Sequence, residues 1–326
     1  MERLNNESQL DFVKRIVDEK LNKKTLKTSY EDLSELIFGE GNCFNESEVR
    51  KRLYGMKFLF ELMEKENNEY IANRILSISD CHVPFQLSLE TYKDYIGKVD
   101  TLQFNGDILD CQSISSFPKV YRVSMLEEMV EARQYIIDII NMIKPKKVVI
   151  NYGNHELRFQ NYIAKQMGED MAQLMPMTAL DLICVDGFHY YDKRNGTKIW
   201  YEPLEKVFTN IEVKYTENWW CQIGDTIFCH PKAFNSGIMK TAEKAMLWFR
   251  NEGYNFKNLV MAHTHRIGSY VVGDTVIYEQ GTCSDVSKQN YLDGNLVNSQ
   301  KEGFIYLCQD INGNTLKNKT DLVILN

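Results

Sequence analysis

Residues 74–82 read RILSISDCH, an apolar run that ends in an aspartate and a histidine two residues apart. The run has the length and composition of a buried strand. Side chains at positions i and i+2 of an extended segment point the same way, so Asp80 and His82 are expected to face one space beyond the strand. The same arrangement recurs downstream, and its repetition decides the fold prediction.

Four further polar clusters follow apolar runs along the chain. These clusters are Gly106-Asp107-Ile108-Leu109-Asp110 after residues 101–105, Gly153-Asn154-His155-Glu156 after 148–152, His230 after 227–229, and His263-Thr264-His265 after 259–262. The carboxyl ends of strands are where open α/β sheets bind ligands. The sequence therefore predicts one site assembled from five strand ends.

The connections between these runs predict an α/β architecture. A long helical stretch from about 122 to 143 ends before Pro145 and lies between two predicted strands, which is typical of a parallel sheet. Gly-Asp turns at 224–225 and 273–274, and Asn312-Gly313, indicate hairpins. We expect a chain that begins as an α/β sheet and ends in antiparallel strands.

Histidine is scarce, and its placement predicts metal binding. The chain has six histidines, and all but His189 lie in the polar clusters. One such histidine alone is more simply a buried side chain with a satisfied hydrogen bond, but five in ordered clusters favour ligation. Carboxylates, imidazoles and an asparagine carbonyl form a mixed nitrogen and oxygen shell that suits Mn, Fe, Zn or Ni rather than Ca. An aspartate with ligands on both sides can bridge two ions.

The motif order DxH, GDxxD, GNHE, H, HxH resembles that of the calcineurin-like metallophosphoesterase superfamily, from about residue 71 to the end of the chain. The resemblance implies an α/β fold, a two-sheet β-sandwich flanked by helices. It also implies two divalent metal ions, with Mn²⁺ expected and Fe, Zn or Ni as alternatives. Carried over by motif, the first ion is held by Asp80, His82 and His265, the second by Asn154, His230 and His263, and Asp107 bridges them.

The resemblance also implies catalytic roles. His155 corresponds to the histidine that contacts the phosphate and aids the leaving oxygen, and Asp110 orients it. The implied mechanism is in-line attack by a hydroxide that bridges the two ions. Arg158 follows the GNH motif and is a candidate phosphate ligand, although a surface or ion-paired role is equally compatible with its position.

The details of the motifs narrow the substrate prediction. Protein serine/threonine phosphatases of the superfamily have arginine directly after the second aspartate of GDxxD, where this chain has Cys111. The DNA-repair exonucleases have aspartate where Glu156 stands. We expect a phosphodiesterase acting on nucleic acid or a nucleotide. A phosphomonoesterase and an inactive scaffold of the same fold are the alternatives.

Residues 1–70 have a different composition and predict a small helical region. A short helix is expected from Ser29 to Phe38, and a second one, capped near Asn45, has an apolar face from Val49 to Leu62. This pair is compatible with a helix-turn-helix docking module, with Arg50, Lys51 and Arg52 as candidate nucleic-acid contacts. Acidic residues outnumber basic ones in this region, so a solvated charged face is the alternative.

The remaining expectations concern the second domain, 71–326, and the chain as a whole. Residues from about 168 to 221, rich in methionine and aromatic residues, predict a cap-like insertion that forms either a satellite core or a lid. The net charge of −7 excludes a uniformly basic surface. The eight cysteines form no CxxC pair, which predicts free thiols in a cytoplasmic protein. No apolar stretch is long enough for a membrane span, so no membrane segment is expected. The sequence does not predict an oligomeric state.

Overall fold

The computed structural model describes residues 3–4, 7–39, 41, 44–69, 71–116, 123–192, 195–288 and 300–325. The chain forms two compact units, Met1–Ile71 and Ala72–Asn326. Each unit is described separately below. Within the described residues, no helix combines the length and the apolar character needed to cross a membrane.

The first unit is helical. It contains α1 (Gln9–Val17), a π-helical turn (Asp18–Asn22), α2 (Tyr30–Phe38) and α3 (Glu46–Glu69). Serine side chains cap α1 and α2, and the amide of Glu48 donates to the Asn45 side chain at the start of α3 (3.0 Å). Gly39 ends α2 with a φ of 89°, a conformation that favours glycine. The two predicted helices are therefore confirmed.

The core of the first unit uses only part of the predicted apolar face of α3. Val49 and Leu53 are fully buried, whereas Leu59 is 56% exposed. The buried core consists of Phe12, Val13, Ile16, Val17, Leu33, Ile37, Val49 and Leu53. The apolar face predicted as far as Leu62 is thus buried within this unit only over the first turns of the helix.

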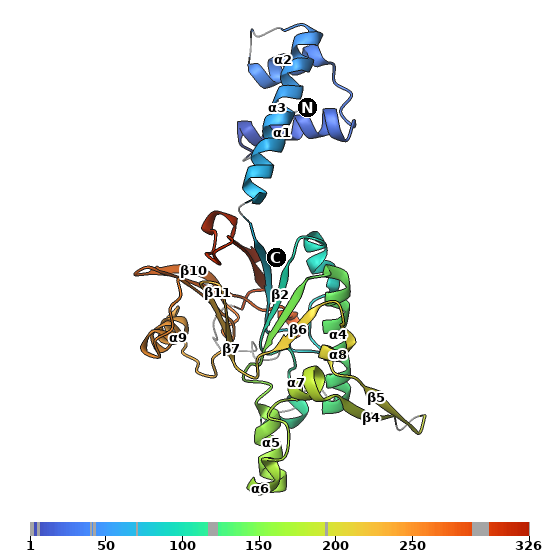
Figure 1. Ribbon diagram of the computed structural model, residues 1–326, viewed down its shortest axis with the longest axis vertical. Helices are drawn as coiled ribbons and strands as arrows, with labels where there is room; N and C mark the ends of the chain where they lie inside the picture. The colour runs from blue at the N-terminus through green and yellow to red at the C-terminus, as the bar shows by residue number, and fades with distance from the viewer. Residues whose placement is uncertain are drawn as a thin grey trace. The chain divides into compact units, whose positions relative to one another are not determined.

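The described residues of the second unit form two large β-sheets and a separate two-stranded hairpin (Figure 1). The six-stranded sheet has the order β13-β12-β1-β2-β3-β6, formed by Asp321–Ile324, Gly303–Gln309, Asn73–Ile78, Thr101–Asn105, Lys147–Asn151 and Glu212–Tyr215. The five-stranded sheet has the order β10-β11-β9-β8-β7, formed by Ile267–Val272, Thr275–Gln280, Asn258–Met261, Thr226–Cys229 and Trp220–Ile223. Strands β1, β2, β3 and β6 are parallel, as are β8, β9 and β11.

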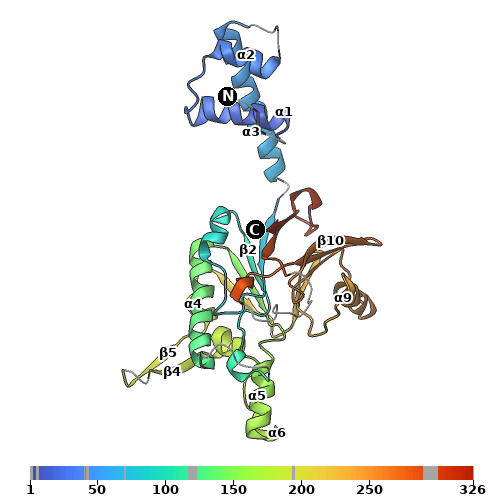
Figure 2. The same cartoon turned by 180° about the vertical axis from the view of Figure 1, so that it is seen from behind.

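The two sheets pack face to face, with helices on their outer faces. One apolar cluster joins residues of both sheets, such as Ile75 and Val149 with Phe228 and Val260. Helix α4 (Met125–Ile143) packs on the six-stranded sheet and α9 (Lys240–Asn251) on the five-stranded sheet (Figures 1 and 2). The predicted α/β sandwich flanked by helices is confirmed.

Short elements complete the second unit. They are α5 (Arg158–Met167), α6 (Glu169–Ala172), α7 (Ala179–Asp181), α8 (Leu204–Val207), the β4–β5 hairpin (Phe188–Asp192 and Thr197–Tyr201), a π-helical turn at Leu182–Asp186, and 3₁₀ turns at Leu89–Tyr95, Gln112–Ile114, Val286–Lys288 and Lys317–Lys319. The two predicted Gly-Asp turns join β7 to β8 and β10 to β11. The seven cysteines within the described residues are buried and form no disulfide, as predicted.

The segment from about 168 to 221 is divided between the periphery and the sheets. Its helix α7 contributes Ala179 and Leu180 to the main core, and its last strands, β6 and β7, belong to the two sheets. The β4–β5 hairpin extends away from the sheets, and its Tyr191 and Trp200 are exposed (Figure 1). The aromatic residues of this segment therefore do not form a single satellite core.

Glu128 on α4 is a buried carboxyl group with a predicted effect on stability. It is 1% exposed, and burial raises its pKa to about 8, although the Cys111 amide donates to it. The ordinary pKa of a glutamate in the unfolded chain is 4.5, so the free energy of unfolding falls as pH rises from about 4.5 to 8. Glutamine cannot ionise, so the free energy of unfolding of Glu128→Gln should not share this fall. We expect its difference from wild type to be larger at pH 8 than at pH 5 by on the order of 2 kcal/mol.

Urea unfolding of the metal-free protein at both pH values measures this gain. Glu131→Gln is the control, because Glu131 is exposed on the same helix. An equal stability difference at both pH values would show that Glu128 does not stay protonated in the folded protein.

Candidate metal centre

All seven predicted metal ligands lie at the carboxyl ends of parallel strands. Asp80 and His82 follow β1, Asp107 follows β2, and Asn154 follows β3. His230 follows β8, and His263 and His265 follow β9. Because these strands belong to two packed sheets, residues nearly 200 positions apart in the sequence meet at one edge of the sandwich.

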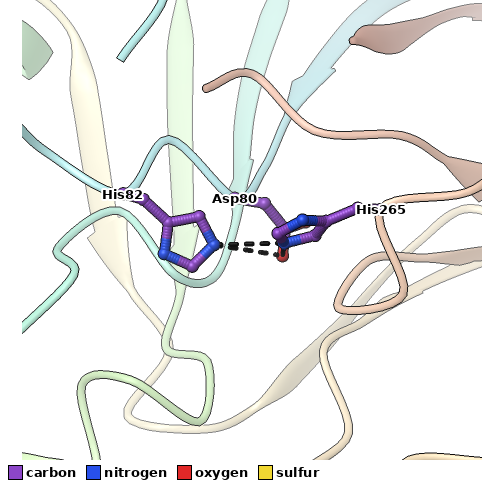
Figure 3. A group of neighbouring side chains, drawn as sticks. All are labelled: Asp80, His82 and His265. Atoms are coloured by element: carbon purple, nitrogen blue, oxygen red, sulfur yellow. Dashed lines mark hydrogen bonds and ion pairs between the residues drawn. The ribbon is translucent and has the colours of Figure 1, made fainter. Parts of the chain in front are cut away.

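The first group consists of Asp80, His82 and His265, all buried (Figure 3). The His82 and His265 Nε2 atoms are 3.1 Å apart, and His265 Nε2 is 3.1 Å from Asp80 Oδ1. His82 Nε2 lies 3.9 Å from the same oxygen. Two imidazole nitrogens and a carboxylate oxygen thus converge on one point, which is the ligand set that a transition metal prefers.

The second group adjoins the first and contains Asp107, His230 and His263. His230 Nε2 lies 3.1 Å from Asp107 Oδ2 and 3.2 Å from Asn154 Oδ1. The same nitrogen is 3.9 Å from Asp80 Oδ1, so the two groups share one space. The Nε2 atom of His263 is buried without a hydrogen-bond partner among the described residues.

The hydrogen bonds around His230 fit metal ligation. Its Nδ1 lies 2.8 Å from the backbone oxygen of Asn105, which places the Nδ1 proton there and directs Nε2 towards Asp107 and Asn154. Asn105 is held in turn, because its side-chain amide donates to the backbone oxygens of Cys229 and Val260. This contact joins the two sheets directly beneath the site.

The electrostatics of the centre show paired charges. Burial raises the pKa of Asp80, but His230 and His265 outweigh it and bring the pKa to about 2. Burial lowers the pKa of His230, but Asp107 and Asp80 outweigh it and raise the pKa to about 10. Burial and the neighbouring His230 lower the pKa of His263 to about 4. The two carboxylates are therefore charged and hold a proton on His230, which a bound cation has to displace.

Backbone strain is concentrated at the same residues. Asp80, His82, Asp107, His263 and His265 all have positive φ angles, between 47° and 81°. Such angles are uncommon for residues other than glycine and cluster at functional sites. They turn the chain sharply after β1, β2 and β9, where these five candidate ligands lie.

His155, Asp110 and Arg158 lie beside the metal groups. His155 Nδ1 is 2.9 Å from the backbone oxygen of Asp110 and 3.1 Å from its Oδ1 atom. His155 Nε2 is 3.8 Å from Asp107 Oδ2 and 2.8 Å from Arg158 Nη2. Although burial raises the pKa of Asp110, contacts with His155 and His82 outweigh it and hold the pKa well below its usual range.

His82, Asp110 and His155 also form a group with the spacing of a metal site. The Arg158 guanidinium touches His155, however, and a second cation there is disfavoured by charge repulsion. His82 Nε2 belongs to the first group, and its Nδ1 faces Asp110 at 3.4 Å. Asp110 therefore lies between two imidazoles, and its backbone oxygen holds the His155 ring at Nδ1. Its Oδ1 atom and His82 Nδ1 are both buried without a hydrogen-bond partner among the described residues.

A comparison with protein-family models agrees with this geometry. The model for calcineurin-like phosphoesterases matches residues 73–267. The chain belongs to the calcineurin-like phosphoesterase family. The resemblance predicted from the motif order is therefore confirmed, and the matched range contains all of the predicted ligands.

Several solved structures match the chain at low sequence identity. Vacuolar protein sorting 29 from Cryptosporidium parvum is 13% identical, with 78% of this chain and 97% of that chain covered and a TM-score of 0.37. The zinc complex of vacuolar protein sorting 29 from Entamoeba histolytica is 14% identical, with 78% of this chain and 99% of that chain covered and a TM-score of 0.36. A novel archaeal phosphodiesterase is 13% identical, with 77% and 99% covered and a TM-score of 0.31. A comparison with curated proteins found no match.

Glu156 is a positioning residue whose role the sequence did not reveal. Its carboxylate is fully buried and accepts the amides of Asp107 (3.0 Å), Leu109 (3.0 Å) and Gly153 (2.7 Å). Burial and the nearby Asp107 raise its pKa to about 7. Glu156 thus joins the loop after β2 to the loop after β3. The only sequence signal was a glutamate where nucleases of the superfamily have aspartate.

Two glycines allow the loops to approach so closely. A Cβ atom on Gly153 would lie 2.2 Å from Asp107 Oδ1, and one on Gly106 would lie 2.6 Å from His230 Nδ1. Gly106 also has a φ of 81°. Both glycines of the GDxxD and GNHE motifs are therefore required by the packing of ligand side chains against the backbone.

The predicted nucleic-acid contacts lie on α3 of the helical unit. The Arg52 guanidinium is 3.9 Å from the centre of the Phe44 ring and 3.3 Å from the Glu48 carboxylate. Arg50 lies 5.9 Å from the Tyr30 ring centre, and both Arg50 and Lys51 are exposed. Arg52 is thus engaged within its own unit, whereas Arg50 and Lys51 present their charges to solvent.

Proposed function

We propose that this phosphoesterase hydrolyses phosphodiester bonds in nucleic acid or a nucleotide with two divalent metal ions. The observation that carries the proposal is the pair of adjoining ligand groups that meet at His230, with His155 at their edge. One ion would be held by Asp80, His82 and His265. The other ion would be held by Asn154, His230 and His263, and Asp107 would contact both ions. All seven ligands are present, which favours an enzyme over an inactive scaffold.

The metal ions would supply Lewis acidity and lower the pKa of bound water. The residues of the chain supply the remaining functions. Asp110 holds the His155 ring through its backbone oxygen, 2.9 Å from Nδ1, and Arg158 Nη2 donates to Nε2 at 2.8 Å. His155 would donate a proton from Nε2 to the leaving oxygen once the Arg158 guanidinium has turned to the phosphate and Nε2 has taken up a proton. Arg158, whose Nη2 contacts that Nε2 atom, would bind a non-bridging phosphate oxygen.

We propose Mn²⁺ as the preferred ion, since a mixed shell of imidazole, carboxylate and amide suits it, with Fe, Zn and Ni as competitors. The buried free thiols support a location in the reducing cytoplasm. No membrane partner is proposed.

The experiment compares bis-p-nitrophenyl phosphate, p-nitrophenyl phosphate, and single- and double-stranded DNA, with each metal added to purified protein. Turnover of the diester and of DNA would support the proposal. Turnover of the monoester alone would establish a phosphomonoesterase instead. Absence of turnover with every metal would support the inactive scaffold.

The basic cluster on α3 gives a separate prediction. If Arg50 and Lys51 contact phosphates, the double substitution Arg50→Ser, Lys51→Ser lowers DNA affinity and reduces the slope of log affinity against log salt by about 2. Binding of a double-stranded DNA fragment across a salt series measures this slope. Arg52 is left unchanged, because it packs on Phe44.

The control is the double substitution Lys24→Ser, Lys27→Ser, which removes the same charge from exposed residues of the same unit. Equal slopes for both double variants would show that the α3 cluster is a solvated charged face.

A further inference from the structure

An aromatic cavity of about 360 Å³ opens beside the second ligand group. It lies between α9 and the loop of residues 231–239, and two ligand residues, Asn154 and His230, form part of its wall. Its volume is within the range of small-molecule sites. The cavity therefore adjoins the candidate metal centre, and a substrate with its phosphate at the centre would place an attached group at the cavity.

Four aromatic side chains form part of the cavity wall. Tyr152, Trp219, Phe234 and Trp248 line it. The Trp219 ring centre is 5.2 Å from that of Trp248, and the Phe234 ring meets His263 edge to face at 5.9 Å. Flat aromatic surfaces stack with nucleobases of any sequence. An aliphatic group would gain burial but no stacking in the same space.

The loop that forms one wall is fixed by a buried arginine. Arg266 is 7% exposed and donates to the backbone oxygens of Gly237 (2.9 Å) and Ser236 (2.7 Å). The Thr241 hydroxyl at the start of α9 accepts the Asn235 amide (2.9 Å). The wall that carries Phe234 is therefore held in place before a ligand binds, which reduces the entropy cost of binding.

Two positive charges complete the cavity. Lys232 and Lys244 line it, both are exposed, and neither has an ion-pair partner in the described part of the chain. Lysines in this position would neutralise phosphates that flank the scissile one. Aromatic walls and unpaired cations together match the alternation of bases and phosphates in a nucleotide chain.

We propose that this cavity is a nucleobase subsite that binds the base of the nucleotide whose phosphate is hydrolysed. This inference rests on the proposed phosphodiesterase function and specifies its substrate class as a nucleotide or nucleic acid.

The test compares two ligands that differ only by a base, dAMP and 2-deoxyribose 5-phosphate. Dissociation constants are measured by calorimetry and by quenching of tryptophan fluorescence, with metal-free and Mn²⁺-supplemented protein. The ratio of the two constants isolates the contribution of the base. We expect dAMP to bind about 10-fold tighter or more.

Trp248→Ala and Phe234→Ala should remove most of this preference and leave the affinity for deoxyribose phosphate unchanged. Both side chains are more than 40% exposed, so the variants are expected to fold. Trp200→Ala, an exposed tryptophan on the distant β5 strand, is the matched control and should keep the preference.

Equal binding of the two ligands, or an unchanged preference in both cavity variants, would overturn the subsite. Tighter binding of octyl phosphate than of dAMP would also overturn it, in favour of an aliphatic occupant. Hydrolysis of bis-p-nitrophenyl phosphate by the same preparation separates the two proposals. An active preparation without base preference overturns only the subsite, and an inactive one overturns the proposed function.

Discussion

Asp107→Asn is expected to lower kcat/KM for a phosphodiester by about 10³-fold or more, because several kilocalories per mole of metal-dependent stabilisation are lost. Asparagine keeps the oxygen that accepts the His155 amide at 2.8 Å, so the loop should keep its shape. The substitution replaces Asp107 Oδ2, which lies 3.1 Å from His230 Nε2, with an amide nitrogen. The resulting side chain carries no charge and cannot bridge two cations.

Metal content and steady-state kinetics of the Asp107→Asn protein measure this effect. We expect fewer than two bound ions per chain. Asp94→Asn, which changes an exposed aspartate on the 3₁₀ turn Leu89–Tyr95, should bind metal and turn over substrate like the wild type. A fully active Asp107→Asn protein with two ions would remove Asp107 from the bridging position.

His155→Ala is expected to lower kcat by about 10²–10⁴-fold while both ions stay bound, since the ring would act as a proton donor and not as a ligand. The size of the loss should depend on the leaving group. p-Nitrophenolate leaves without protonation, so bis-p-nitrophenyl phosphate should show a smaller loss than a dinucleotide, whose alkoxide needs a proton. This difference distinguishes proton donation from a purely structural role.

Asp110→Asn and Arg158→Ala extend the same test. Asp110→Asn should have a smaller effect than His155→Ala, because the ring keeps its contact with the Asp110 backbone oxygen at 2.9 Å. Arg158→Ala should raise KM more than it lowers kcat if the guanidinium binds ground-state phosphate. Equal losses with both leaving groups, or loss of metal from His155→Ala, would contradict the donor role.

The sequence predicted the strands that precede the candidate ligands, because each of them is an apolar run with a polar end. The runs before Asp80, Asp107 and Asn154 became β1, β2 and β3, and the Gly-Asp turns became hairpins. These features depend on local patterns, which a single sequence displays. The family followed from the motif order, and the family match confirmed it.

The supporting contacts could not be predicted in the same way. Glu156 accepts amides from two loops, and Asn105 joins the two sheets, but both depend on segments that are distant in the sequence. A buried polar residue in an apolar run indicates a hydrogen bond but not its partner. The aromatic cavity has the same origin, because Tyr152, Trp219 and Trp248 come from three separate elements.

The strand order has a consequence for how the site is made during synthesis. The first ligand is Asp80 and the last is His265, and β1, which carries Asp80 and His82, lies between β2 and β12, a strand that ends at Gln309. The ribosome must therefore release the residues through Gln309 before β1 gains both of its neighbours. Contacts this distant in sequence form slowly. The set of candidate ligands is thus complete only after His265 has been made, late in the synthesis of this unit.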